Sequence, residues 1–276
     1  MSVKQRLKIF VLLCLLISAL LACDVVPSIS FNGTPVTSSA TNAANQGLPP
    51  LNTWTQAGSG IELRSEQWTS PGNNQDTVVI TRIDPHRVHL KIAYLPNDPL
   101  SMSAWMKKMQ AKVIINGGYF DKNNHPTGLL VDDGQIFGSS YQGFGGMFAV
   151  DKQGNVTVSS LGQQPYNPNS ADLDEATQSA PMLVVNGKRT QFDANAASQR
   201  RTVIATDKQG RLLFITSSGP AFTLDELADL LASSDLSINN ALNLDGGAST
   251  ALYVNTPAQK VNIDSFSPLP IVLVVR

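Results

Sequence analysis

The sequence predicts an α+β domain in which a mixed or antiparallel β-sheet core carries two or three short helices. Most apolar segments are short and end in Asp-Gly, Asn-Gly or Gln-Gly turns, which are typical of neighbouring antiparallel strands. Helical spacing is confined to a few segments. No Gly-x-Gly-x-x-Gly, P-loop or Gly-x-Ser-x-Gly sequence is present, so nucleotide-binding folds and the α/β-hydrolase fold find no support.

The N-terminus has the pattern of a secretory leader. Basic residues lie in the first positions, and the apolar run over residues 9–21 is shorter than the about 20 residues that a transmembrane helix needs. The run ends in Leu-Leu-Ala-Cys, which resembles a bacterial lipobox with Cys23 as the lipidated residue. We therefore expect a lipoprotein signal peptide over residues 1–22. An ordinary signal peptide or a single membrane anchor is the alternative.

Residues 23–53 are rich in Ser, Thr, Asn, Pro and Ala and carry hardly any charge, which is typical of a flexible tether. The tether would join the membrane, held through lipid on Cys23, to a domain over residues 54–276. Because Cys14 lies in the leader, the mature domain has no cysteine for disulfides or thiolate metal ligands. We expect the protein in the bacterial cell envelope, on the outer side of the cytoplasmic membrane, with the leaflet left open. The net charge of −1 predicts no nucleic-acid partner.

Turn and capping signals divide residues 54–276 into strands and helices. Ser101 is expected to cap a helix over residues 102–111, and Thr223 begins a capping box that opens a second helix. Residues 257–267 are expected to form a loop before the last strand. The expected strands include residues 77–83, 87–95, 127–131, 135–137, 145–150, 155–160, 203–206, 211–216 and 269–275.

Two stretches that lie far apart in the chain each combine an apolar strand, a polar side chain and paired glycines. They are Asn116-Gly117-Gly118-Tyr119 and the stretch that contains Asn243, Asp245, Gly246, Gly247 and Ser249. We expect the glycines to turn the backbone with positive φ and to let it approach a ligand closely. The two stretches are expected to meet at one pocket; a plain turn between strands is the alternative at each.

Arg200 and Arg201 stand at the start of a predicted strand. Neighbouring side chains of a strand point to opposite faces, so at most one of the two enters a given pocket. Adjacent arginines are usually solvated, and we expect this of one of them.

Taken in order, these motifs resemble the phosphodiester glycosidase family. The resemblance runs from about residue 111 to the C-terminus. It rests on Ile115-Asn116-Gly117-Gly118-Tyr119-Phe120, Pro126-x-Gly128-Leu129, Ser179-x-Pro181-x-Leu183, Arg201-Thr202, the helix after Thr223, and Asn243-Leu244-Asp245-Gly246-Gly247-x-Ser249. It implies an enzyme that hydrolyses a sugar 1-phosphate diester, and the leader places this enzyme in the cell envelope.

The chemistry of such a substrate fits these residues. A phosphate leaves readily, so the site needs positive charge and N–H donors at the phosphate and one carboxylate near the anomeric carbon. The resemblance gives Asp245 and Arg201 these catalytic roles, with Asp245 as nucleophile, as base for water or as a stabiliser of an oxocarbenium-like state. The expected substrate-binding residues are Asn116, Gly117, Gly118, Tyr119, Asn243, Gly246, Gly247 and Ser249.

The chain also departs from the family pattern. Ala248 stands where the family usually has a third glycine, Ala205 where it often has a glycine, and Ser218 where it tends to have an acidic residue. These departures keep a second interpretation open, a non-catalytic module that binds envelope glycans.

Two further alternatives concern the chemistry of the site. A serine hydrolase that uses Ser249 or Ser179 would need a placed histidine, and no histidine of the chain has a recognisable setting for it. Asp245 and Asn243 offer hard oxygen ligands that suit Ca²⁺ or Mg²⁺, although no metal-ligand spacing is present, so no metal is assigned.

Overall fold

The structure is a computed structural model that describes residues 45–169, 172–192 and 197–276. The predicted signal peptide, the lipidation site Cys23 and most of the predicted tether lie outside these residues. Within them, no helix combines the length and the apolar character that crossing a membrane requires.

The largest sheet has eight strands, and every neighbouring pair in it is antiparallel. A helix, α3 (Leu224–Ser233), packs against it. In spatial order the strands are β13 (Lys188–Arg189), β12 (Met182–Val185), β16 (Ile238–Asn243), β14 (Gln199–Asp207), β15 (Leu212–Phe222), β4 (Gln75–Ile83), β3 (Ile61–Thr69) and β2 (Thr55–Gly58).

A second sheet has six strands and packs against the helix α2 (Met102–Met109). Only its outermost pair, β1 with β18, is parallel. In spatial order it contains β1 (Asn45–Gln46), β18 (Gln259–Ile263), β17 (Leu252–Asn255), β6 (Val113–Asn116), β19 (Ile271–Val275) and β5 (Leu90–Tyr94).

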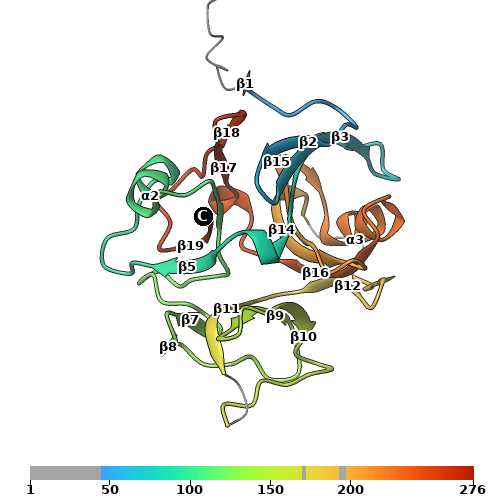
Figure 1. Ribbon diagram of the computed structural model, residues 1–276. Coiled ribbons are helices and arrows are strands. Elements are labelled where there is room, and N and C mark those ends of the chain that lie inside the picture. The colour runs from blue at the N-terminus through green and yellow to red at the C-terminus, as the bar shows by residue number, and fades with distance from the viewer. Residues whose placement is uncertain (1–44, 170–171, 193–196) are drawn as a thin grey trace, which may run out of the picture. The chain divides into compact units, whose positions relative to one another are not determined.

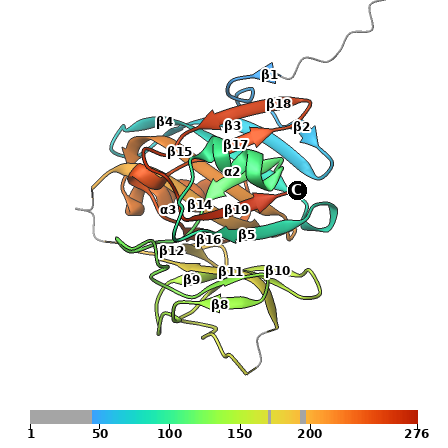
Figure 2. The same cartoon turned by 90° about the vertical axis from the view of Figure 1, so that its left-hand side faces the viewer.

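The third sheet has five antiparallel strands and lies below the other two in both views (Figure 1, Figure 2). Its strands are, in spatial order, β10 (Val156–Ser160), β9 (Gly146–Asp151), β11 (Leu173–Ser179), β7 (Leu130–Asp132) and β8 (Gln135–Phe137). Mixed, mostly antiparallel sheets with two short α-helices among the described residues confirm the predicted α+β class.

One apolar core is shared by all three sheets. Phe214 of β15, Ile115 of β6 and Phe148 of β9 belong to the same buried cluster and are at most 1% exposed. The opposite face of the eight-stranded sheet packs under α3, and α2 covers the six-stranded sheet with the fully buried Trp105. Burial from several sheets at once fixes where the strand ends meet, and the candidate site lies at such a meeting point.

Both predicted helices form with the predicted caps. The Ser101 hydroxyl accepts the Ala104 N–H, and Thr223 and Glu226 form the reciprocal capping box. The predicted loop over residues 257–267 is wrong in part, because residues 259–263 form β18. There buried and exposed residues alternate, a strand pattern that Gln, Lys and Asn obscure in the sequence.

Candidate active site

The two glycine-containing stretches meet, as the sequence predicts. β16 ends at Asn243, and two residues later the chain contacts the stretch over residues 116–119. There the Asp245 N–H donates to the Gly117 carbonyl at 3.2 Å. The Asn116 Nδ2 donates in return to the Asp245 carbonyl at 2.7 Å. β6 and β16 belong to different sheets, so the site stands on a junction between two rigid elements.

The predicted positive φ occurs at one of the four glycines, and the other three are required for a different reason. Only Gly247 has a positive φ, of 57°, whereas Gly246 has a φ of −118°. A Cβ on Gly117 would stand 2.3 Å from Ile271 Cγ2, and one on Gly118 would stand 2.5 Å from the Gln178 carbonyl oxygen. These two glycines therefore serve close packing between strands rather than a left-handed turn.

Asn116 is enclosed, and its hydrogen bonds are all internal. Its side chain is 1% exposed; Nδ2 donates to the carbonyls of Asp245 and Gly117, and Oδ1 accepts from the Thr202 hydroxyl and the Ala251 N–H. An amide has two donors and two acceptor positions, and all four are occupied. Asn116 thus holds the Asp245 corner, and its amide keeps no free hydrogen-bonding position for the predicted contact with substrate.

The Asp245 carboxyl is partly buried and faces few donors. Its Oδ1 accepts the Gly246 N–H at 2.9 Å, and the Ser249 hydroxyl also bonds to the carboxyl. Burial raises the pKa of Asp245 above its usual range, and these two hydrogen bonds offset only part of that rise. A carboxylate that is raised in energy in this way is a stronger base than one in water.

Tyr119 is tied to the same corner through Asn243. The Asn243 Nδ2 donates to the Tyr119 hydroxyl at 2.9 Å and to the carbonyls of Ala180 and Leu244 at 3.1 and 2.8 Å. The two carbonyls fix which end of the amide is the nitrogen. Burial raises the pKa of Tyr119, the nearby Asp245 carboxylate raises it further, and the Arg201 guanidinium and the Asn243 amide lower it in part.

Arg201 supplies a cation that has no carboxylate partner in the part of the chain that the structure describes. Its Nε and Nη2 donate to the carbonyls of Phe222 and Ala197 at 3.1 and 2.9 Å. No carboxylate of the described residues lies within 4.0 Å of its guanidinium, and none of these residues accepts a hydrogen bond from Nη1. Burial lowers the pKa of Arg201. A buried guanidinium with free N–H groups is a suitable receptor for an anion.

The prediction that one of the two arginines is solvated is wrong. Arg200 and Arg201 are 6% and 8% exposed. They leave β14 on opposite sides, and Arg200 donates to the carbonyls of Ser218, Gly247 and Asp264 while its guanidinium stacks on the ring of Phe266. Carbonyls from three separate segments of the chain take the place of water around Arg200, and no local sequence signal predicts this.

Sequence reasoning also missed Tyr141. Its hydroxyl lies 2.6 Å from the Thr127 Oγ1, and its electrostatic influence reaches the Tyr119 phenol. The glycine-rich composition of residues 138–146 could have indicated it, because such a composition is typical of a loop that can carry function.

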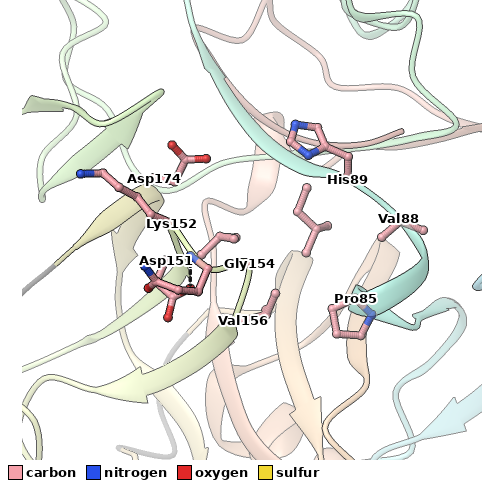
Figure 3. A pocket seen from close by; sticks show the side chains of 11 residues that line it. Pro85, Val88, His89, Asp151, Lys152, Gly154, Val156 and Asp174 are labelled. Atoms are coloured by element: carbon pink, nitrogen blue, oxygen red, sulfur yellow. Dashed lines mark hydrogen bonds between the residues drawn. The ribbon is translucent and has the colours of Figure 1, made fainter.

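Three cavities of the structure lie away from this corner. One, of 310 Å³, lies between residues 85–90 and the β9–β10 turn, as Figure 3 shows with His89 on one side and Lys152 on the other. The other two adjoin Trp54 and the edge of β10. None of the three is lined by Asp245, Arg201 or Tyr119.

One group of carboxylates among the described residues has the spacing of a metal site. Asp132, Asp133 and Glu175 place one oxygen each within 4.8 Å of one another. The Lys91 ammonium already lies among them, at 3.1, 2.5 and 3.4 Å, and supplies the cation. The group therefore fits a salt-bridge network better than a metal centre.

The class of the protein follows from a match to a family model. A model of the phosphodiester glycosidase family matches residues 109–276, which is more than half of the chain, and the chain belongs to that family. It contains a domain of the kind that hydrolyses glycosyl phosphodiesters.

Particular relatives differ widely from the chain. It is 29% identical to the uncharacterized protein YigE of Escherichia coli over 150 residues, which cover 50% of this chain and 56% of that protein. The chain therefore spans little more than half the length of this relative.

Among solved structures, the catalytic domain of zebrafish N-acetylglucosamine-1-phosphodiester alpha-N-acetylglucosaminidase, auto-inhibited by its pro-peptide, is similar at a TM-score of 0.64 and 19% identity, over 80% of this chain and 87% of that one. A hypothetical protein from Synechocystis has a TM-score of 0.55 at 17% identity and covers 78% and 62% of the two chains. A putative exported protein from Burkholderia pseudomallei has a TM-score of 0.55 at 15% identity and covers 74% of each. At these identities the likeness extends to the fold alone.

Proposed function

We propose that this protein hydrolyses a sugar 1-phosphate diester, with Asp245 and Arg201 as its catalytic residues. The observation that carries the proposal is a buried guanidinium, without a carboxylate partner among the described residues, near a carboxyl whose pKa is raised. A Cβ on Gly246, the residue after Asp245, would stand 3.9 Å from the Arg201 Nη1. A phosphodiester brings the missing negative charge to Arg201, and its sugar brings an electrophilic carbon toward Asp245.

The reaction breaks the bond between the anomeric carbon and the phosphate oxygen. The phosphate leaves as a monoester and takes the electron pair of that bond, so it needs a cation more than a proton. In one course Asp245 removes a proton from water as the water oxygen bonds to the anomeric carbon. In the other Asp245 itself bonds to that carbon, and water then releases the sugar. NMR of the first-formed sugar separates the two, because inversion indicates the base and retention the nucleophile.

Tyr119 fits a role as hydrogen-bond donor to the substrate. The Asn243 nitrogen can only donate to it, so the phenol oxygen accepts there and its own proton is free to point elsewhere. Its raised pKa keeps the phenol protonated at neutral pH. A neutral phenol that lies near enough to feel the charges of both Asp245 and Arg201 can donate to a phosphate oxygen or a sugar hydroxyl.

The test is release of free reducing sugar from a synthetic sugar 1-phosphate diester. We expect Asp245→Asn and Arg201→Met to lower kcat/KM by roughly 10²- to 10⁴-fold. The matched controls Asp172→Asn and Arg87→Met change exposed residues outside the corner and leave the rate unchanged. Binding of the diester without turnover by the wild type would instead assign a non-catalytic glycan-binding module, and full activity of Asp245→Asn would remove this residue from the mechanism.

We also propose that the domain acts in the bacterial cell envelope, held on the outer side of the cytoplasmic membrane by lipid on Cys23. The basic, then apolar, leader and its Leu-Leu-Ala-Cys end support this proposal. A tether over residues 23–53 would let the site reach substrates away from the bilayer surface.

A further inference from the structure

An aromatic pair on the loop over residues 138–145 lies beside the proposed catalytic corner. The rings of Tyr141 and Phe144 stack, with centroids 4.7 Å apart and planes 25° from parallel. Thr127 joins the pair to Tyr119, because its N–H donates to the Tyr119 carbonyl at 3.0 Å and its hydroxyl lies 2.6 Å from that of Tyr141. Phe144 is 55% exposed. Tyr141 thus lies on the side of the corner, and Phe144 presents the exposed aromatic face of the pair to solvent.

The pair is held rigidly rather than left mobile. Gln178 is 2% exposed; its Oε1 accepts the Tyr141 N–H at 2.8 Å, and its Nε2 donates to the Ser140 hydroxyl at 2.9 Å. The Tyr141 ring also rests on Gly128, where a Cβ would stand 3.0 Å from the ring. A buried side chain and a glycine therefore fix the ring on which Phe144 stacks.

The surroundings indicate what the open face binds. Exposed polar residues, Ser139 and Gln142, flank the pair, and the Thr127 hydroxyl bonds to that of Tyr141. A single aromatic face among hydroxyl and amide groups suits a sugar ring, which packs its C–H face on the aromatic and its hydroxyls on the polar groups. An isolated ring of this kind is too small to hold a lipid chain or a protein partner.

We propose that Tyr141 and Phe144 form a subsite for a second sugar ring, so that the preferred substrates are glycosyl phosphodiesters with at least two rings. The inference rests on the proposed function, since it extends the site that Asp245 and Arg201 define. It narrows the substrate class from any sugar 1-phosphate diester to an oligosaccharide or polysaccharide one.

The test compares two synthetic sugar 1-phosphate diesters, one with a single sugar ring and one with two. We expect Phe144→Ala to raise KM for the two-ring substrate by roughly 3- to 10-fold, the loss typical of one aromatic contact, and to leave kcat and the one-ring KM unchanged. Phe144→Trp keeps a flat ring and is expected to retain the wild-type KM. Because Phe144 is exposed, Phe144→Ala should keep the wild-type melting temperature.

Phe266→Ala is the matched control, because Phe266 is 78% exposed and its N–H bonds to Ala248 beside the same corner. Equal KM effects on both substrates in Phe144→Ala, or an effect confined to Phe266→Ala, would overturn the subsite. Failure of the proposed function has a different signature: neither substrate is hydrolysed by the wild type, or both are hydrolysed at full rate by Asp245→Asn.

Discussion

The junction between β5 and the five-stranded sheet predicts a specific loss of stability with rising pH. β5 is an edge strand, and its N–H groups at Ile92 and Tyr94 donate to carboxylates of the neighbouring sheet, Glu175 at 2.8 Å and Asp132 at 3.2 Å. Glu175 is 1% exposed, and burial raises its pKa from 4.5 to about 7. The ionised form of Glu175 is therefore disfavoured in the folded protein relative to the unfolded chain.

The sign and size follow from proton linkage. Between pH 4.5 and about 7 the folded protein binds a proton at Glu175 that the unfolded chain has lost, so stability falls as pH rises. The difference between the two pKa values corresponds to about 3 kcal/mol in the free energy of unfolding, and this stability is lost once the pH exceeds about 7. Lys91 stays charged throughout: burial lowers its pKa, but the hydrogen bonds to Asp133 and Asp132 outweigh burial and raise it overall.

The assay is urea unfolding of the wild type and of Glu175→Gln from pH 4 to pH 8. Glutamine has the same shape as glutamate and does not titrate. Its altered contacts shift the free energy of unfolding by the same amount at every pH, so they do not affect the comparison of the two pH dependences. We expect the free energy of unfolding of the wild type to fall by about 3 kcal/mol relative to the variant across this range. The control is Asp172→Asn, since the hydrogen bond from Lys152 lowers the pKa of Asp172 and places its titration below the range. A difference between wild type and Glu175→Gln that stays constant with pH, or rises, refutes the reasoning.

Four other substitutions test the site and its anchoring. Asp245→Asn should raise the melting temperature at neutral pH and lose this gain in acid, because burial disfavours the charge that the variant removes; calorimetry at two pH values would show no such gain if the carboxyl were solvated. Asn116→Ala should cost about 3 kcal/mol in urea unfolding, because it leaves buried partners unsatisfied, and a loss within error would contradict the bond network. Gly118→Ala should cost about 1–3 kcal/mol through its clash with a backbone carbonyl, and a variant as stable as wild type would show that the strands can separate there. Cys23→Ser should shift the expressed protein from the detergent phase to the aqueous phase of a Triton X-114 partition, and unchanged partition would remove the lipid anchor.

Local patterns explain which parts of the fold could be predicted. The caps of both helices depend on residues within one turn, so Ser101 and the Thr223 box are legible in the sequence. β18 was missed because its buried face is recognisable only once a neighbouring strand covers it. The order of the three sheets depends on contacts between distant segments, which local propensity does not encode.

The same division applies to the site. The sequence marked Asp245, Arg201 and Tyr119 as candidates because polar groups beside glycines at strand ends are conspicuous, and the structure brings them to one corner. It did not show that Asn116 is enclosed. That outcome depends on Thr202 and Ala251, which come from other elements.

By itself, the sequence determined the α+β class, the helix caps and the residue types at two strand ends, since each depends on neighbours close in the chain. Tertiary structure decided the rest. Packing from other strands set the need for Gly117 and Gly118. Carbonyls from distant segments bind both arginines, three at Arg200 and two at Arg201, and among the described residues Arg201 Nη1 keeps N–H groups without an acceptor. These are properties of contacts between segments that no local pattern specifies.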